Sequence, residues 1–333
     1  MSKSTKPDII VVDSLPLLQS AIDAAITGSV PQTQTSIPSL FINTIQQTNP
    51  DNKYNPLSIL TLYLPPKKTI YLIDIPKLGT ESVSTVVTSD GTSLKHVLES
   101  ADILKVVFDA RRASSVLFTL YGVSIDGIRD VQLMELGTRP GSKEFLAGLE
   151  GCVLKNGRTF SEVEIQAWNG VRKGVGSALR GGYNGIFDER PIRQDVKEYC
   201  AGEVTVLVDL FKVYDAKLKP PGEAFWRNYI LDTTRERVRR SRESGFSGAS
   251  KFDDRGPWDS ESIEEAIDRW NDDVMDSAMN PEETDDDRWN IHIMEEAMNP
   301  EEDDYDDYRW VDDGPTSCRD IINDRDYDDY YSD

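Results

Sequence analysis

The alternation of apolar and polar positions predicts β-strands in the first part of the chain. Residues 8–13 form a short apolar run rich in β-branched side chains, and similar runs lie at 39–44, 57–64 and 69–75. The last two runs are joined by PPKK at 65–68, a tight connection typical of an antiparallel pair. We therefore predict one early strand and then a three-stranded meander.

Helical spacing of apolar residues predicts most of the remaining elements. A first helix follows Ser14, with apolar positions at Leu17, Leu18, Ala21, Ile22 and Ala25. Helices and strands then alternate at 93–99, 104–108, 113–121 and 123–131. Further helices reach about residue 218, and we interpret the glycine-rich stretch at 170–185 as a flexible connection. This order predicts an α/β sheet of mixed direction with helices on its faces.

Charge divides the chain into a slightly basic body and an acidic tail. From residue 251 onward there are 31 acidic and 7 basic residues, against 28 acidic and 30 basic ones before. The tail contains an imperfect repeat: residues 269–283 recur 19 positions later, and Arg309-Trp310 begins a third copy. A repeat this short and polar cannot bury its own core, so we predict a largely disordered tail with helical patches such as 262–270.

These patterns suggest three parts. They are an α/β domain at 8–218, a basic helical extension at 219–246 and the acidic disordered tail at 247–333. The Trp, Tyr and Met residues of the tail offer contacts for a protein partner, although a merely solvating tail is the simpler interpretation.

The titratable side chains exclude several kinds of site. Cys152, Cys200 and Cys318 are too few and too far apart for a disulfide framework or a zinc knuckle, and His96 and His292 are the only histidines. No apolar core of a signal peptide and no apolar run long enough to span a bilayer is present. We expect a soluble intracellular protein, nuclear or cytoplasmic, and no membrane partner.

Two groups of arginines are candidates for contacts with nucleic-acid phosphates. Arg111 and Arg112 follow the strand at 104–108, and a basic helix predicted at 225–244 includes Arg235, Arg239 and Arg240. Surface salt bridges are the alternative for the first group, and pairing with the acidic tail is the alternative for the second.

Seven segments together resemble the ribonuclease D-like (DEDDy-type) 3′–5′ exonuclease domain, particularly its fungal form. The segments are SLFI (39–42), SILTLY (58–63), TIYLID (69–74), KVVFDAR (105–111), GIRDVQL (127–133), FDERPI (187–192) and YCAGEV (199–204). Each is unspecific alone, but their order and spacing match the family over residues 8–245. The resemblance implies a ribonuclease H-like fold, in which an antiparallel meander and parallel strands form one mixed sheet flanked by helices.

The resemblance also implies a particular set of ligands. In that family an Asp-x-Glu pair, a second Asp and a Tyr-x-x-x-Asp motif surround two divalent ions, Mg²⁺ or Mn²⁺, which hold the scissile phosphate and activate a water. The tyrosine, one helical turn from its Asp, positions that water.

Carried onto this chain, the set of ligands is degenerate. The Asp-x-Glu pair falls on Asn43 and Ile45, the second Asp falls on Ala113, and the last motif survives as Tyr199 and Glu203. Two ions would bring four positive charges to one carboxylate, so any metal on Glu203 and the Asn43 oxygen is expected to be weakly held or absent.

Two functions from different classes remain open. The first is a catalytically impaired exonuclease-fold protein that binds RNA or single-stranded DNA or acts as a scaffold. The second is an active metal-dependent 3′–5′ exonuclease that uses Tyr199, Glu203 and one substitute acid, Asp74 or Asp109. A packed tyrosine ring and a solvated glutamate are the structural alternatives for the surviving pair.

Overall fold

The computed structural model describes residues 6–28, 38–46, 56–156, 160–180, 185–243, 246 and 254–279. The strands are β1 (Asp8–Val12), β2 (Leu40–Gln46), β3 (Leu57–Leu64), β4 (Thr69–Asp74), β5 (Lys105–Val107) and β6 (Ile128–Asp130). The helices are α1 (Leu15–Gly28), α2 (Ile75–Leu78), α3 (Leu94–Glu99), α4 (Ala110–Tyr121), α5 (Val131–Thr138), α6 (Leu149–Lys155), α7 (Glu162–Arg180), α8 (Gln194–Leu218), α9 (Ala224–Arg240) and α10 (Ser260–Met279).

The strands form one mixed sheet in the order β1-β4-β3-β2-β5-β6. Strand β3 runs antiparallel to β2 and β4, whereas β1 is parallel to β4, and β5 is parallel to both β2 and β6. The predicted tight link is a 3₁₀ turn at Pro65–Lys67, closed by Lys68 in the left-handed region at φ 49°. The predicted mixed α/β sheet with its meander is thus confirmed.

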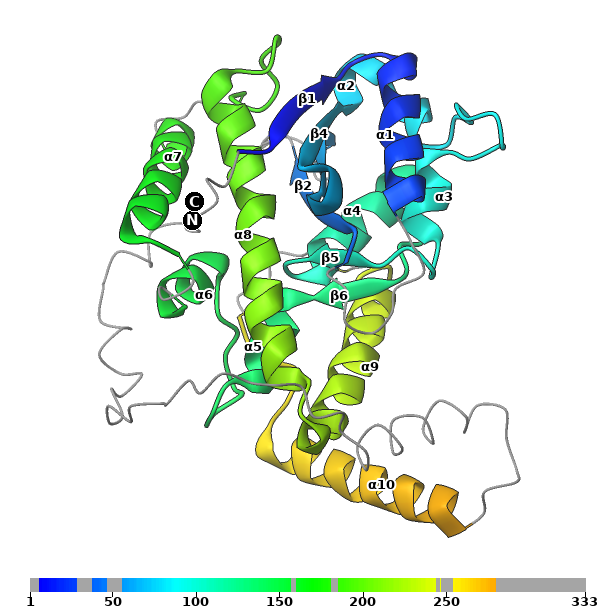
Figure 1. Ribbon diagram of the computed structural model, residues 1–333, viewed down its shortest axis with the longest axis vertical. Coiled ribbons are helices and arrows are strands. Elements are labelled where there is room, and N and C mark those ends of the chain that lie inside the picture. Colours follow the sequence, from blue (N-terminus) through cyan, green and yellow to red (C-terminus); the bar gives the residue numbers. More distant parts are fainter. Residues whose placement is uncertain are drawn as a thin grey trace. The chain divides into compact units, whose positions relative to one another are not determined.

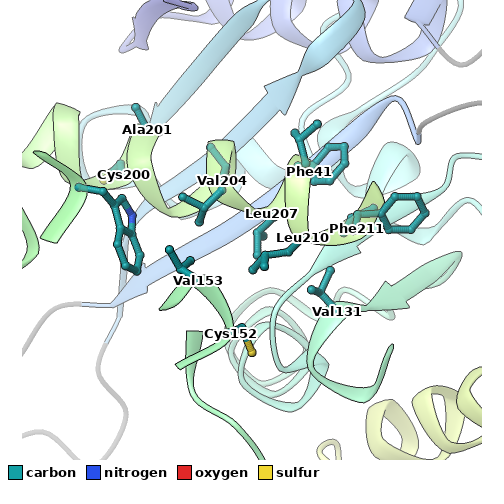
Figure 2. Packing of buried hydrophobic residues seen from close by; sticks show 14 of the residues in the cluster. Phe41, Val131, Cys152, Val153, Cys200, Ala201, Val204, Leu207, Leu210 and Phe211 are labelled. Atoms are coloured by element: carbon teal, nitrogen blue, oxygen red, sulfur yellow. The ribbon is translucent and has the colours of Figure 1, made fainter. Parts of the chain in front are cut away.

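Helices cover both faces of this sheet (Figure 1). On one face α8 packs on β2 and β3, and its apolar side chains share a core with Phe41 and Ile45. Figure 2 shows Phe41 of β2 beside Val204 and Leu207 of α8. On the other face α1, α3 and α4 pack on the intervening strand residues, such as Ile42. The two cores arise because successive strand side chains point to opposite faces.

Three local predictions differ from the structure. Helix α4 begins at Ala110 because Asp109 caps it, accepting from the Arg111 amide at 3.3 Å. Only Ile128–Asp130 of the segment predicted as strand-like pairs in the sheet. The interpretation of residues 170–185 as a flexible connection is wrong for 170–180, which belong to α7. This helix buries Trp168 and Val175, seven residues and two turns apart, and tolerates glycine on its outer face.

Part of the predicted acidic tail is a packed helix. Helix α10 spans Ser260–Met279, and Trp258 just before it is 2% exposed. The Trp258 Nε1 donates to the Thr233 hydroxyl at 3.0 Å, and its ring stacks on Tyr229 with 5.3 Å between centroids. Ordered structure therefore continues to Met279, beyond the predicted patch at 262–270. The second and third repeat copies lie outside the described residues.

None of the helices that the structure describes has both the length and the apolar character needed to cross a membrane.

A buried lysine lies at the start of β5. Lys105 is 0% exposed, and its Nζ donates to the carbonyls of Val97 at 3.1 Å and Ser100 at 2.5 Å, at the C-terminal end of α3. Burial lowers the pKa of this ammonium to about 8, although Asp126 and Asp102 act in the opposite direction. Folding therefore disfavours the charged form.

The lowered pKa of Lys105 makes the free energy of unfolding increase with pH. Because the pKa of Lys105 is lower in the folded than in the unfolded chain, its penalty is complete below pH 8 and disappears as the pH rises toward 10.5. Between pH 7.5 and 9.5 the wild-type free energy of unfolding should rise by about 1–2 kcal/mol relative to Lys105→Met. Urea unfolding of both proteins at the two pH values measures this. Other groups that titrate in this range cancel in the comparison, and an unchanged difference would contradict the prediction.

Candidate functional site

The resemblance places the site between β2 and α8, and the structure brings these elements together. Residues Phe41, Asn43 and Ile45 alternate along β2 toward the face covered by α8, because Phe41 and Ile45 share a core with its side chains. Tyr199 lies in the same helix, against the same core. Of the predicted site residues, Asn43, Ile45, Tyr199 and Glu203 therefore share one face of the sheet.

The three substituted positions offer little to a metal ion. Asn43 is half-buried, and its Oδ1 already accepts from the Thr44 amide at 3.0 Å. Ile45 is 8% exposed and Ala113, on α4, is 6% exposed, so both are parts of the packed interior. Hard divalent ions need oxygen ligands, and these three side chains provide one neutral oxygen among them.

The surviving carboxylate has a partner that the sequence analysis did not identify. Glu203 forms an ion pair with Arg172 of α7, and the two side chains are 12% and 26% exposed. The guanidinium also lies over the ring of Trp168, 4.7 Å from its centre. Tyr199, one turn before Glu203, packs its ring 5.8 Å from that of Phe187. The carboxylate is thus neutralised by the protein itself.

The pKa shifts follow from this burial. Desolvation raises the pKa of Glu203 and the Arg172 guanidinium lowers it in part; burial and the nearby charge of Glu203 together raise the pKa of Tyr199. Burial alone would lower the pKa of Arg172, but Glu203 more than offsets it. We take the pair as ionised because an arginine in direct contact with a carboxylate keeps its proton across the physiological range.

Asp74 and Asp109, the candidate substitute ligands, are bound to other groups. Asp74 is 1% exposed and accepts from Nε of Arg190 at 2.5 Å. Asp109 accepts from Nε and Nη2 of Arg111 at 2.7 and 2.8 Å. Burial acts to raise the pKa of Asp109, but Arg111 outweighs it and the pKa is lowered. Each acid therefore already has a cationic partner.

Asp130 is the centre of a buried network that joins three elements. It is 0% exposed, and its two oxygens accept, each at 3.0 Å, from the amides of Asp109, Ala110 and Gln132 and from Nη1 of Arg237. Its bond to Gln132 caps α5, as expected for an acid at a helix start. The network fixes α4, α5 and the basic helix α9 to one another.

The candidate phosphate-binding arginines differ in their surroundings. Arg111 is part of the half-buried pair with Asp109, whereas Arg112 is exposed. On α9, Arg235, Arg239 and Arg240 are 75%, 61% and 69% exposed. Their ion-pair partners Asp232, Glu236 and Glu243 lie on or just beyond the same helix. Exposed pairs of this kind contribute little stability, so phosphates can replace them at small cost.

Sequence reasoning missed Arg172 and Trp168 because it treated part of their helix as a loop. The available signal was their spacing: Trp168, Arg172, Val175 and Leu179 recur at three- and four-residue intervals and occupy one helix face. The pairing of Arg172 with Glu203 spans 31 positions, and no local pattern predicts it.

Comparisons with known proteins identify the fold. No family model matches the chain, and no curated protein matches it.

The Trypanosoma brucei RNase D in complex with RNA U12 has a TM-score of 0.58 and 18% identity, covering 78% of this chain and 79% of its own. The RNase D–GMP complex from the same organism has a TM-score of 0.55 and 19% identity, covering 72% of this chain and 65% of its own. A third structure of the Trypanosoma brucei RNase D has a TM-score of 0.51 and 18% identity, covering 72% of this chain and 74% of its own. The fold that the sequence predicted is confirmed: this chain has the fold of the RNase D exonuclease.

Proposed function

We propose that this protein is a catalytically impaired member of the 3′–5′ exonuclease type, which binds single-stranded nucleic acid or acts as a scaffold. The observation that supports it is the set of side chains at the four carboxylate positions. Three of them are Asn43, Ile45 and Ala113, and the fourth, Glu203, is paired with Arg172.

These residues do not fit a pair of divalent ions. Two Mg²⁺ or Mn²⁺ ions need several anionic oxygens to offset their charge in a partly buried cleft. Across the described residues, no three Asp, Glu, His or Cys side chains are grouped so that they could hold a metal ion. We therefore assign no reaction step to a metal here, and we treat Tyr199 and Glu203 as remnants of the motif.

Nucleic-acid binding is the function that the fold and the surface support best. The solved RNase D with the most similar fold among those described above was determined with RNA U12. In this chain Arg112, Arg235, Arg239 and Arg240 are exposed and able to contact phosphates. RNA and single-stranded DNA both fit such a surface, because these contacts read charge rather than bases.

The proposed function divides between the folded domain with its basic extension and the acidic tail. We assign the binding function to the domain at 8–218 with the basic extension at 219–246, in a nuclear or cytoplasmic setting. The acidic tail is assigned a protein partner, since it interleaves Trp, Tyr and Met with its charges.

The test combines binding and cleavage on 3′-labelled single-stranded RNA and DNA. We expect salt-dependent binding without release of nucleotides in Mg²⁺ or Mn²⁺. The triple variant Arg235→Ala, Arg239→Ala, Arg240→Ala should bind more weakly and reduce the slope of log affinity against log salt by about 2. Lys67→Ala, an exposed cation on the β3–β4 turn, is the matched control and should change neither.

Robust Mn²⁺-dependent digestion that disappears in Glu203→Ala would establish the active exonuclease instead. Absence of binding to both RNA and DNA would leave only the scaffold role.

A further inference from the structure

The contact between α7 and α8 combines a charged pair with close packing. Glu203 and Arg172 are both largely shielded from solvent, at 12% and 26% exposure. A buried carboxylate without a counter-ion is strongly unfavourable, so the charge on Arg172 matters more here than in a surface pair.

Packing around Trp168 fixes the position of this arginine. Trp168 is 9% exposed and lies against Gly202 of α8, the residue before Glu203. A Cβ at Gly202 would be 2.9 Å from the Cδ1 of Trp168, closer than side chains tolerate. The missing side chain at Gly202 thus lets the indole approach α8. The indole in turn supports the guanidinium, whose carbon lies 4.7 Å above the ring.

We propose that Arg172 is a built-in cation that takes the place of divalent metal beside Glu203, so that the pair clamps α7 onto α8 without any ion. The inference deepens the proposed function and shares its premise that the ancestral set of metal ligands is degenerate. It adds a role for each residue: Glu203 holds α7, and Arg172 compensates its charge.

Two consequences follow from this assignment. The guanidinium contacts Oε1 of Glu203, so a divalent cation at this carboxylate would compete with it. In addition, the pair holds α7 together with a small number of buried side chains. In the described part of the chain, the buried residues of α7 are Trp168 and Val175. Loss of the pair should therefore loosen α7 more than the rest of the domain.

A double-mutant cycle on the full-length protein tests the clamp. Arg172→Met leaves Glu203 buried and unpaired, and the melting temperature should fall by about 6–10 °C. Glu203→Met should cost less, because Arg172 is the more exposed partner and can reach solvent. The double variant should melt well above Arg172→Met, since an apolar pair of similar volume replaces the buried ions. The control Arg193→Met breaks exposed pairs with Asp195 and Glu189 and should shift melting by less than about 2 °C.

Amide hydrogen exchange and metal titration complete the test. In Arg172→Met, exchange should accelerate in α7 and stay unchanged in β3 and β4. Addition of Mn²⁺ or Mg²⁺ should leave the wild-type melting temperature unchanged. Additive losses in the cycle would overturn the clamp. A metal-dependent rise of several degrees that vanishes in Glu203→Met would overturn the substitution of arginine for metal. If the clamp holds while nucleotides are released from oligonucleotides, the proposed function fails and the clamp stands.

Discussion

Asp130→Ala is expected to destabilise the domain by about 3–5 kcal/mol, the largest effect of any single substitution considered in the body of the protein. The change removes the acceptor of three amides, two of them in buried contacts, and leaves the Arg237 guanidinium, 7% exposed, without its carboxylate. Unpaired buried donors and an uncompensated charge account for the size of the loss. Equilibrium urea unfolding measures it.

If the alanine variant does not fold, Asp130→Asn separates the loss of hydrogen-bond acceptors from the loss of charge. The amide keeps one oxygen acceptor but not the charge, so an intermediate loss is expected. Arg237→Met should be destabilising in the wild type but nearly neutral in an Asp130→Asn background, because the two residues form one pair. Asp23→Ala, on the exposed face of α1, is the control and should change stability by less than about 0.5 kcal/mol. A loss at Asp130 no larger than this control would contradict the network.

Trp258→Ala should lower the free energy of unfolding by about 3–5 kcal/mol, although the residue belongs to the region predicted as a disordered tail. The indole is 2% exposed, stacks on Tyr229 at a centroid distance of 5.3 Å, lies tilted against Trp226 at 5.4 Å, and donates to Thr233. Thermal unfolding followed by tryptophan fluorescence or calorimetry measures the loss.

Two truncations show where the folded chain ends. A protein that stops after residue 279 should melt within about 2 °C of the full-length chain, whereas one that stops after residue 253 should lose as much as Trp258→Ala. The backbone contributes too, since the Leu146 amide donates to the Asp254 carbonyl at 2.7 Å and the Gly256 amide to the Glu144 carbonyl at 2.6 Å. Equal melting temperatures of the two truncated proteins would contradict this boundary.

The strands were the most predictable part of the fold. β3 and β4 are runs rich in leucine, β-branched and aromatic residues, joined by a proline-containing turn, and such patterns depend only on neighbours in sequence. The second half of α7 was missed because Gly170, Gly174 and Gly176 argue against a helix, while its apolar face is set by contact with α8.

In the candidate site too, some residues were predictable from the sequence and others were not. The resemblance alone led to the prediction that Asn43, Ile45 and Ala113 occupy ligand positions of the family. The positions of Arg172, Arg190 and Arg237 beside Glu203, Asp74 and Asp130 were not, since these pairs span 31, 116 and 107 residues. Their formation depends on the tertiary structure, and a sequence pattern carries no information about such distances. The exposed arginines of α9 were predicted, but their acidic neighbours on the same helix were overlooked.

Under the proposed function, the arginine beside Glu203 also bears on whether hydrolysis could be restored by substitution. Restoring aspartate at position 203 shortens the side chain by one methylene and weakens its contact with Arg172, the more exposed partner. Removing Arg172 first leaves an uncompensated acid. Either order passes through a less stable intermediate, and three more carboxylates must still be introduced. Under the proposed function, the Arg172–Glu203 pair between α7 and α8 therefore disfavours a stepwise return to hydrolysis, because each single change lowers stability.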